Sequence, residues 1–258
     1  MQERLILITS LYLIFGLFEM RFGAEKGHSL SNKLLNIFYG AVLFISGIVM
    51  VGFINSIIPF RARSLADKGI GFSLLMALLY IFLTDFIFYW YHRAQHKFKY
   101  LWVVHELHHS DTELNVTTSM RTYWLERPIQ ALLITIPITY LVGLDARAIK
   151  IFPVLLTAWL FFTHVNIKLR LGFLTRVICG PQLHRIHHSN LAEHQGKNLA
   201  QFLPIFDILF GTYYHPGYNE FPTTGLMEKS ADSSISKVMI KPFAVWFNFS
   251  PGKKLKNI

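Results

Sequence analysis

The sequence has little cysteine, few acidic residues and no recognisable nucleotide-binding loop. Its 258 residues include one cysteine, Cys179, so an intrachain disulfide and a cysteine-based metal site are both excluded. It contains no glycine-rich phosphate loop, and a chain of this length has no room for a separate reductase or haem domain beside one apolar domain. Any electrons used by this protein therefore have to come from another molecule.

Acidic side chains are scarce relative to basic ones. The chain has 15 Asp and Glu against 25 Lys and Arg, which gives a formal net charge of +10. No interleaving of basic and aromatic residues or nucleic-acid motif accompanies this excess, so we expect no nucleic-acid partner. In an apolar chain, excess Lys and Arg are typical of loops that face the cytoplasm and anionic lipid.

Apolar residues are abundant instead. Hydrophobic residues make up 52% of the chain and the mean hydropathy is +0.37, which is too apolar for an ordinary soluble domain of this size. Several runs approach the ~20 apolar residues that cross a bilayer. We predict an all-α integral membrane bundle of about four to five membrane helices, forming a single membrane domain over residues 1–258. The apolar runs are Leu5–Met20, Leu35–Phe60, Ile70–Tyr91, Ile129–Leu144 and Ile151–Thr163.

Eight histidines fall into three clusters. Within each cluster the members are three or four residues apart, which places their imidazoles on one face of a helix. One zinc ion needs three or four ligands, so eight histidines indicate two metals, and imidazole suits iron, zinc, copper and nickel alike. The clusters are His92 and His96; His105, His108 and His109; and His184, His187 and His188.

The two shorter apolar runs, Ile129–Leu144 and Ile151–Thr163, are predicted to form a hairpin that enters and returns on one side of the membrane. Such a hairpin would bring the third histidine cluster back to the first two. His164 directly follows the returning run and is a possible ninth metal ligand. The basic half of the chain, which carries the histidines, is expected to form a cap on the cytoplasmic face.

Asp85 is the one charged residue within the run Ile70–Tyr91. A carboxylate inside a membrane segment is costly and usually functional. Asp85, His92 and His96 lie along one helical stripe, so we expect Asp85 to accept the free ring N–H of a metal-ligating histidine and thereby orient it. The competing interpretation is a charge that snorkels to the membrane surface.

Together, the three clusters resemble the signature of the fatty acid hydroxylase/sterol desaturase superfamily of membrane di-iron oxygenases. The matching motifs are His92–His96, His105–His109 and His184–His188, followed by LFGT at Leu209–Thr212. The resemblance covers residues 85–214, which we take as the catalytic region.

The resemblance implies that the eight histidines bind two iron ions on the cytoplasmic side of a membrane helical fold, and His164 resembles an additional histidine of the family. It also implies an O2-dependent hydroxylation or desaturation of a lipid such as a sterol or fatty acyl chain. Because a strong oxidant is needed to attack an inert C–H bond, a metal is required. The electrons would come from an external donor of the cytochrome b5 or ferredoxin type.

Two other functions remain open on the sequence. The segment HELHH, residues 105–109, also matches the His-Glu-x-x-His motif of zinc proteases, with Glu106 as general base. That interpretation leaves most of the clustered histidines unused. The other alternative is a non-catalytic membrane protein that binds metal through its histidines.

Overall fold

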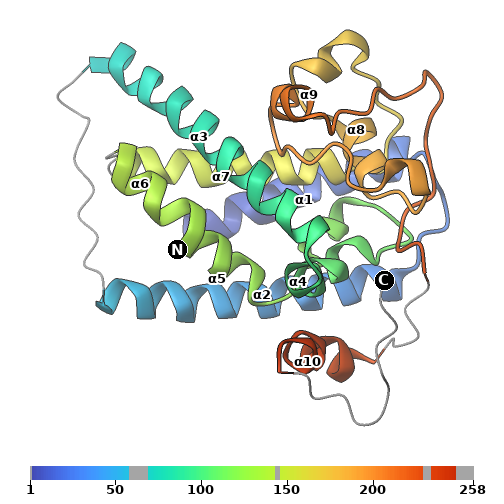
Figure 1. The fold of residues 1–258 in the computed structure, drawn as a ribbon, viewed down its shortest axis with the longest axis horizontal. Coiled ribbons are helices and arrows are strands. Elements are labelled where there is room, and N and C mark those ends of the chain that lie inside the picture. The colour runs from blue at the N-terminus through green and yellow to red at the C-terminus, as the bar shows by residue number, and fades with distance from the viewer. Residues whose placement is uncertain (1, 58–68, 143–145, 229–233, 248–258) are drawn as a thin grey trace.

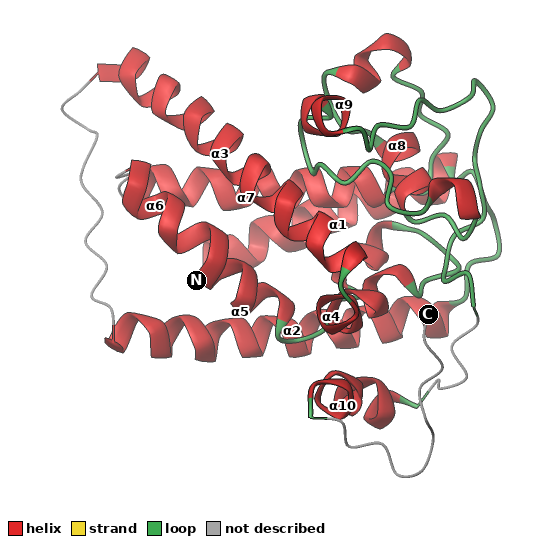
Figure 2. Cartoon of the chain, viewed as in Figure 1, coloured by secondary structure: helices red, strands yellow, loops and turns green. Residues whose placement is uncertain are grey.

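The computed structural model describes residues 2–57, 69–142, 146–228 and 234–247. Every named element in these residues is a helix (Figure 2). The described residues also contain an isolated antiparallel β-bridge between Ser189 and Thr224. The all-α prediction is therefore confirmed for the described part of the chain. The longer helices are α1 (Gln2–Phe22), α2 (Leu30–Ile57), α3 (Gly69–Lys97), α4 (Lys99–His109), α7 (Ala146–His164) and α10 (Ile235–Trp246). The shorter ones are η2 (Val116–Met120), α5 (Glu126–Gln130), η3 (Ala131–Thr135), α6 (Ile136–Val142), η4 (Gly172–Arg176), α8 (Pro181–His187), η5 (Ala192–His194) and α9 (Ile205–Phe210).

The long helices and the loop-rich segments occupy different parts of the molecule. Helices α2 and α7 extend along its long axis, α3 crosses obliquely, and α8 and α9 lie among loops at one end (Figure 1). Helix α1 packs against α7, α3 packs against α4 and α6, and α8 packs against α7. Helix α4 therefore continues from its contact with α3, and α8 lies against α7 at the loop-rich end.

Two described helices contain stretches that are long and apolar enough to cross a membrane, Leu30–Met50 in α2 and Leu74–Lys97 in α3. Large apolar side chains on these stretches are exposed, with 62% of Ile45 and 65% of Leu78 accessible. Exposed apolar surface of this kind marks a lipid or protein interaction site. The total of four to five membrane helices stays a prediction, and residues 58–60 of the predicted second run lie outside the described residues.

The predicted hairpin consists of α5, η3 and α6 on the way out and α7 on the way back, with residues 143–145 outside the described residues. The outgoing arm opens into a π-helical turn at Ala131–Thr135, just before Pro137. Proline lacks an N–H and its ring clashes with the preceding turn, so a wider turn here relieves the clash. The first residue of α5 and the last of α7 both reach the histidines, as the predicted hairpin requires.

Candidate metal centre

All nine histidines singled out in the sequence come together at the loop-rich end. Five of them form one group and four form another, and within each group the possible ligand nitrogens lie within 4.8 Å of one another. Helices α3, α4, α7 and α8 supply the side chains, and His188 directly follows α8. The five-histidine group contains His92, His96, His105, His109 and His187, and the four-histidine group contains His108, His164, His184 and His188.

The two groups are neighbours. The rings of His109 and His188, one from each group, stack with centroids 4.3 Å apart, and the rings of His105 and His108 lie 5.3 Å apart. Each group also combines residues from separate clusters of the sequence, because the spacing within α4 divides its histidines between the two groups. The arrangement therefore offers two adjacent sites rather than one large one.

Hydrogen bonds at Nδ1 fix the tautomer of several of these rings. A backbone carbonyl oxygen can only accept, so a ring nitrogen bonded to it carries the proton. His92 Nδ1 bonds to Leu199 O at 2.7 Å, His187 Nδ1 bonds to Lys197 O at 2.9 Å, and His164 Nδ1 bonds to the carbonyl one turn earlier in α7 at 2.7 Å. With Nδ1 protonated, Nε2 of each neutral ring presents a bare lone pair to the centre.

These bare nitrogens face one another. His92 Nε2 lies 2.9 Å from His105 Nε2, and His164 Nε2 lies 3.2 Å from His108 Nε2. His105 and His108 also direct Nδ1 to oxygen atoms, those of Glu126 and the Arg121 carbonyl, so neither pair has a proton to share. His187 Nε2 is buried without a hydrogen-bond partner. Converging lone pairs of this kind fit a metal cation bound between them.

The charge state of the rings suits metal binding. Burial, followed by the influence of neighbouring histidines, holds the pKa of several rings well below the ordinary value, and burial lowers the pKa of His187 to about 3. These imidazoles are therefore neutral near pH 7 and do not have to lose a proton before they ligate a metal. The others with a strongly lowered pKa outside the candidate membrane stretches are His108, His109, His184 and His188.

Glu126, at the start of α5, is a buried carboxylate that the sequence analysis did not identify. Its Oε1 accepts from His105 Nδ1 at 2.8 Å and from Gln95 Nε2 at 3.2 Å. A carboxylate in this position fixes the ring of a metal-ligating histidine and raises its basicity. No spacing rule connects Glu126 with His105, 21 residues earlier, so a local sequence pattern could not have indicated this contact.

Asp85 does not make the contact that we expected. Its carboxylate accepts three backbone N–H groups, from Gln201 at 2.9 Å, Phe202 at 3.1 Å and Leu203 at 2.6 Å, and no histidine among the described residues bonds to it. Asp85 is fully buried, so a snorkelling charge is also wrong. The stripe on α3 was predicted correctly, but at Asp85 the stripe meets a backbone segment instead of an imidazole.

The segment 199–203 connects Asp85 to the centre. Asp207 of α9 accepts the first two N–H groups of the segment, from Leu199 at 2.7 Å and Ala200 at 3.0 Å, while Asp85 accepts the other three. Two buried carboxylates thus satisfy five consecutive backbone donors. Because the carbonyl of Leu199 bonds to His92, this segment sets the orientation of that ring.

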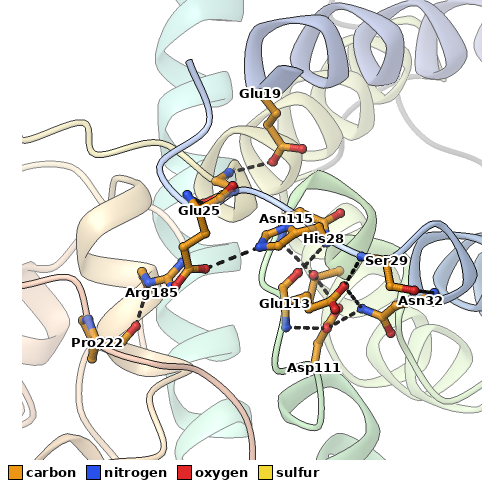
Figure 3. A network of polar contacts seen from close by, with 12 residues as sticks. Glu19, Glu25, His28, Ser29, Asn32, Asp111, Glu113, Asn115, Arg185 and Pro222 are labelled. Carbon is orange, nitrogen blue, oxygen red and sulfur yellow. Dashed lines mark hydrogen bonds and ion pairs between the residues drawn. The ribbon is translucent and has the colours of Figure 1, made fainter. Parts of the chain in front are cut away.

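A polar network fixes α8 and the loop after α4 to the connection between α1 and α2 (Figure 3). Arg185, which lies between two of the α8 histidines, forms an ion pair with Glu25 at 2.6 Å and donates to Pro222 O at 2.8 Å. Asp111 lies two residues after the last histidine of α4, and it accepts a hydrogen bond from Asn32 of α2 at 2.8 Å. The N-terminal helices therefore help to position both histidine-bearing segments.

Glu106 points away from the histidines. Its carboxylate bonds to Lys241 Nζ of α10, at 2.6 and 2.7 Å. A zinc protease needs this glutamate beside the metal as a general base. The zinc-protease alternative therefore lacks its catalytic geometry in this structure.

Three further histidines lie outside the centre. His194 is buried and bonds to Glu220 at 2.9 Å, while His28 lies 3.5 Å from Glu25. His215 bonds to the hydroxyl of Tyr213 at 3.2 Å. Unlike the nine, none of them belongs to a described group of possible metal ligands.

A cavity of about 40 Å³ adjoins the centre. Histidines of both groups form one wall, and apolar side chains of α3, α7 and the segment 199–203 form others. Polar side chains of η2 and α5 complete the lining. The lining includes Phe88, His92, His108, Glu126, Arg127, Gln130, Leu160, Leu199 and Gln201.

The fold and the site define a helical protein with a histidine-rich centre that could hold metal ions. Residues 77–212, more than half of the chain, match the family model of fatty acid hydroxylases. The chain belongs to the fatty acid hydroxylase family, which confirms the resemblance seen in the histidine motifs.

Relatives of known activity agree with this assignment. Ornithine lipid hydroxylase OlsE of Rhizobium tropici is 26% identical over 256 residues, which cover 93% of this chain and 75% of OlsE. Human alkylglycerol monooxygenase is 32% identical over 179 residues, covering 66% of this chain and 38% of the human protein. This chain thus spans less than two fifths of the human relative. No solved structure matches it significantly.

Proposed function

We propose that this protein is a membrane di-iron oxygenase that hydroxylates a lipid, using O2 and electrons from an external donor. The observation that carries the proposal is the pair of adjacent histidine groups with bare nitrogens directed inward. Two groups fit two metal ions, and an all-imidazole ligand set is compatible with iron. The nine histidines are the proposed ligands.

The names of the relatives favour hydroxylation of a lipid over desaturation. One is called a lipid hydroxylase and the other an alkylglycerol monooxygenase. Both names describe oxygen insertion, so we propose hydroxylation as the reaction of this chain and a lipid with a long alkyl or acyl chain as its substrate. A sterol substrate has no support of this kind.

The protein's own residues prepare the centre for this chemistry. Bound iron would supply the oxidising power that side chains lack. Leu199 O and Glu126 hold the rings of His92 and His105 in the tautomer that exposes Nε2. Burial of these rings excludes bulk water, which protects a reactive oxidant from side reactions.

The fold supports the proposal of an external electron donor. The described residues are helices around one centre and include no nucleotide-binding domain, so a cytochrome b5- or ferredoxin-type protein is the proposed donor. We further propose that residues 1–258 form a single membrane domain with residues 85–214 as its catalytic region. The centre would lie at the cytoplasmic ends of the membrane helices, where a lipid can enter from the bilayer and a soluble donor can dock.

Metal and isotope analysis of the purified, membrane-extracted protein tests the proposal. We expect close to two iron ions per chain, and transfer of one oxygen atom from 18O2 to a lipid product when a reductant is supplied. A His215→Ala variant is the matched control, because His215 lies outside the centre. One zinc ion per chain, with activity retained after iron removal, would contradict the proposal and revive the protease alternative.

A further inference from the structure

We propose that Arg127 recognises the oxyanion of an amphiphilic substrate, a phosphate or a carboxylate in its headgroup. This inference rests on the proposed lipid hydroxylase function and narrows its substrate class. It starts from the lining of the cavity, which includes Arg127 and histidines of both groups.

The position of Arg127 follows from its place at the start of α5. The preceding residue, Glu126, is buried and turns toward His105. Consecutive residues on a helix project about 100° apart, so Arg127 cannot share that direction. Its side chain is exposed and lines the cavity. Arg127 is thus positioned at the margin of the cavity and the histidines at its wall.

The charge of Arg127 is available to a ligand. It donates to Gln130 Oε1 at 3.3 Å, and no carboxylate among the described residues forms an ion pair with it. The carboxylate of Glu126 is already bonded to His105 and Gln95. Glu126 lines the same cavity, but it is hydrogen-bonded through Oε1 and lies outside ion-pair distance of Arg127, so the Arg127 cation is not neutralised by an ion pair among the described residues.

Guanidinium groups pair with phosphate and carboxylate through two parallel hydrogen bonds, and such charge-assisted bonds are stronger than neutral ones. The amide groups of Gln130 and Gln201 line the same cavity and can bond to the remaining oxygen atoms. Phe88, Leu160 and Leu199 offer an apolar surface to the adjoining carbon chain. The lining therefore matches an amphiphile with an anionic head.

The arrangement also bears on the position of attack. Because one cavity of about 40 Å³ contacts both Arg127 and the histidines, a headgroup bound at Arg127 leaves little distance to the centre. The carbon atoms presented to the histidines would be those close to the headgroup. A site for the far end of a long chain would need its headgroup anchor well away from the metal ligands.

Binding of two matched lipids to the iron-loaded protein in detergent tests the proposal. The probes are a 1-alkyl lysophosphatidate and a 1-alkylglycerol with the same alkyl chain, which differ in the phosphate. For Arg127→Gln we expect the dissociation constant of the phosphate probe to rise ~10–100-fold, as for a lost charge-assisted bond, and that of the neutral probe to change less than ~3-fold. Arg127→Lys keeps the charge and should lie in between.

Several controls separate this role from a structural one. Arg176→Gln removes an exposed arginine outside the cavity and should leave both dissociation constants unchanged. Inorganic phosphate should compete with the lysophosphatidate only weakly, because it lacks the chain that fills the apolar part of the cavity. If phosphate competed as well as the lipid, the site would bind free anions and the lipid assignment would be wrong.

An unchanged preference for the phosphate probe in both Arg127 variants would overturn the proposal. Equal losses for the two probes would also overturn it, because Arg127 would then act only on the shape of the cavity. The test reads binding rather than turnover, so it is independent of the reaction. Loss of iron from the wild-type protein would count against the di-iron function, whereas a loss of probe discrimination at full iron content concerns Arg127 alone.

Discussion

Two buried carboxylates lie beside the histidine centre and serve it in different ways. Glu126 bonds directly to the ring of His105, whereas Asp85 bonds to three backbone N–H groups of the segment 201–203. The first acts on the charge and tautomer of one ring. The second holds in place the backbone that orients His92. A carboxylate near a metal site is therefore not informative until its partner is known.

The largest effect is expected from removing His105, the proposed metal ligand that bonds to Glu126. His105→Ala deletes a proposed ligand and leaves Glu126 buried without its ring partner. We expect complete loss of hydroxylation and loss of at least one iron per chain, measured by metal analysis. His215→Ala should retain both. Wild-type iron content in His105→Ala would remove the basis for assigning Glu126 to the centre.

Low pH should destabilise the metal-free protein, both in the wild type and in variants of Asp85 or Glu126. Burial lowers the pKa of His187 to about 3 in the folded chain, while an unfolded histidine titrates near ~6.5. Between these two pH values the unfolded state binds more protons than the folded state. The free energy of unfolding is therefore at its full value above pH ~6.5, and it falls by about 1.4 kcal/mol per pH unit, for one proton, as the pH decreases toward 3. Unfolding curves of metal-free protein at several pH values measure it. A flat profile would contradict the burial of neutral rings.

Asp85→Ala tests the carboxylate that bonds to backbone N–H groups. Three buried N–H groups lose their acceptor, which we expect to lower the free energy of unfolding by about 3–5 kcal/mol. Asp85→Asn keeps one acceptor oxygen and should cost less, about 1–3 kcal/mol. The loss should appear in metal-free and iron-loaded protein alike. Normal unfolding combined with selective iron loss would instead favour direct orientation of a histidine.

Glu126→Gln tests the carboxylate that bonds to the ring of His105. The amide oxygen can still accept from His105, but the negative charge that raises the basicity of the ring is gone. We expect a ~10–100-fold loss of iron affinity or turnover, with unfolding of the metal-free protein nearly unchanged. Iron competition assays and chemical unfolding measure the two effects. A stability loss as large as that of Asp85→Ala would erase the distinction between the two carboxylates.

Glu106→Gln should have the smallest effect, because this third carboxylate faces Lys241 instead of the centre. Loss of a partly exposed ion pair costs less than about 1 kcal/mol. Iron content and hydroxylation should stay measurable at close to wild-type levels. An inactive Glu106→Gln protein with a normal fold would indicate a general base and support the protease alternative.

The sequence predicted the contributors to the centre better than the contacts that organise them. Spacings of three and four residues place His105, His108 and His109 on one side of a helix whatever the rest of the chain does, so local geometry was enough. The apolar hairpin similarly predicted that His164 returns to the same end. These features depend on the helix repeat and on hydrophobic length alone.

The remaining features depend on segments far apart in the chain. Asp85 and the N–H of Gln201 are 116 residues apart, and Glu126 meets His105 from a separate helix. No periodicity in one helix specifies which backbone or side chain will face it. His108 and His109 of one helix also belong to different groups. The ring of His108 contacts the histidines at 164 and 188, and the ring of His109 contacts the one at 187, all from distant segments of the chain.

The distribution of histidines along the chain also sets an order of events during synthesis. The five histidines of α3 and α4 leave the ribosome first, and His188 follows His109 after about 80 residues, or roughly 4–16 s at ~5–20 residues per second. The acceptor of His92, Leu199 O, is made later still. During this interval the early histidines are already present without the partners that separate them into two groups. If the chain binds iron as proposed, metal that arrived in this interval would meet an unsorted ligand set, and the two complete sites would form only after α8 and the segment 199–203 have been added.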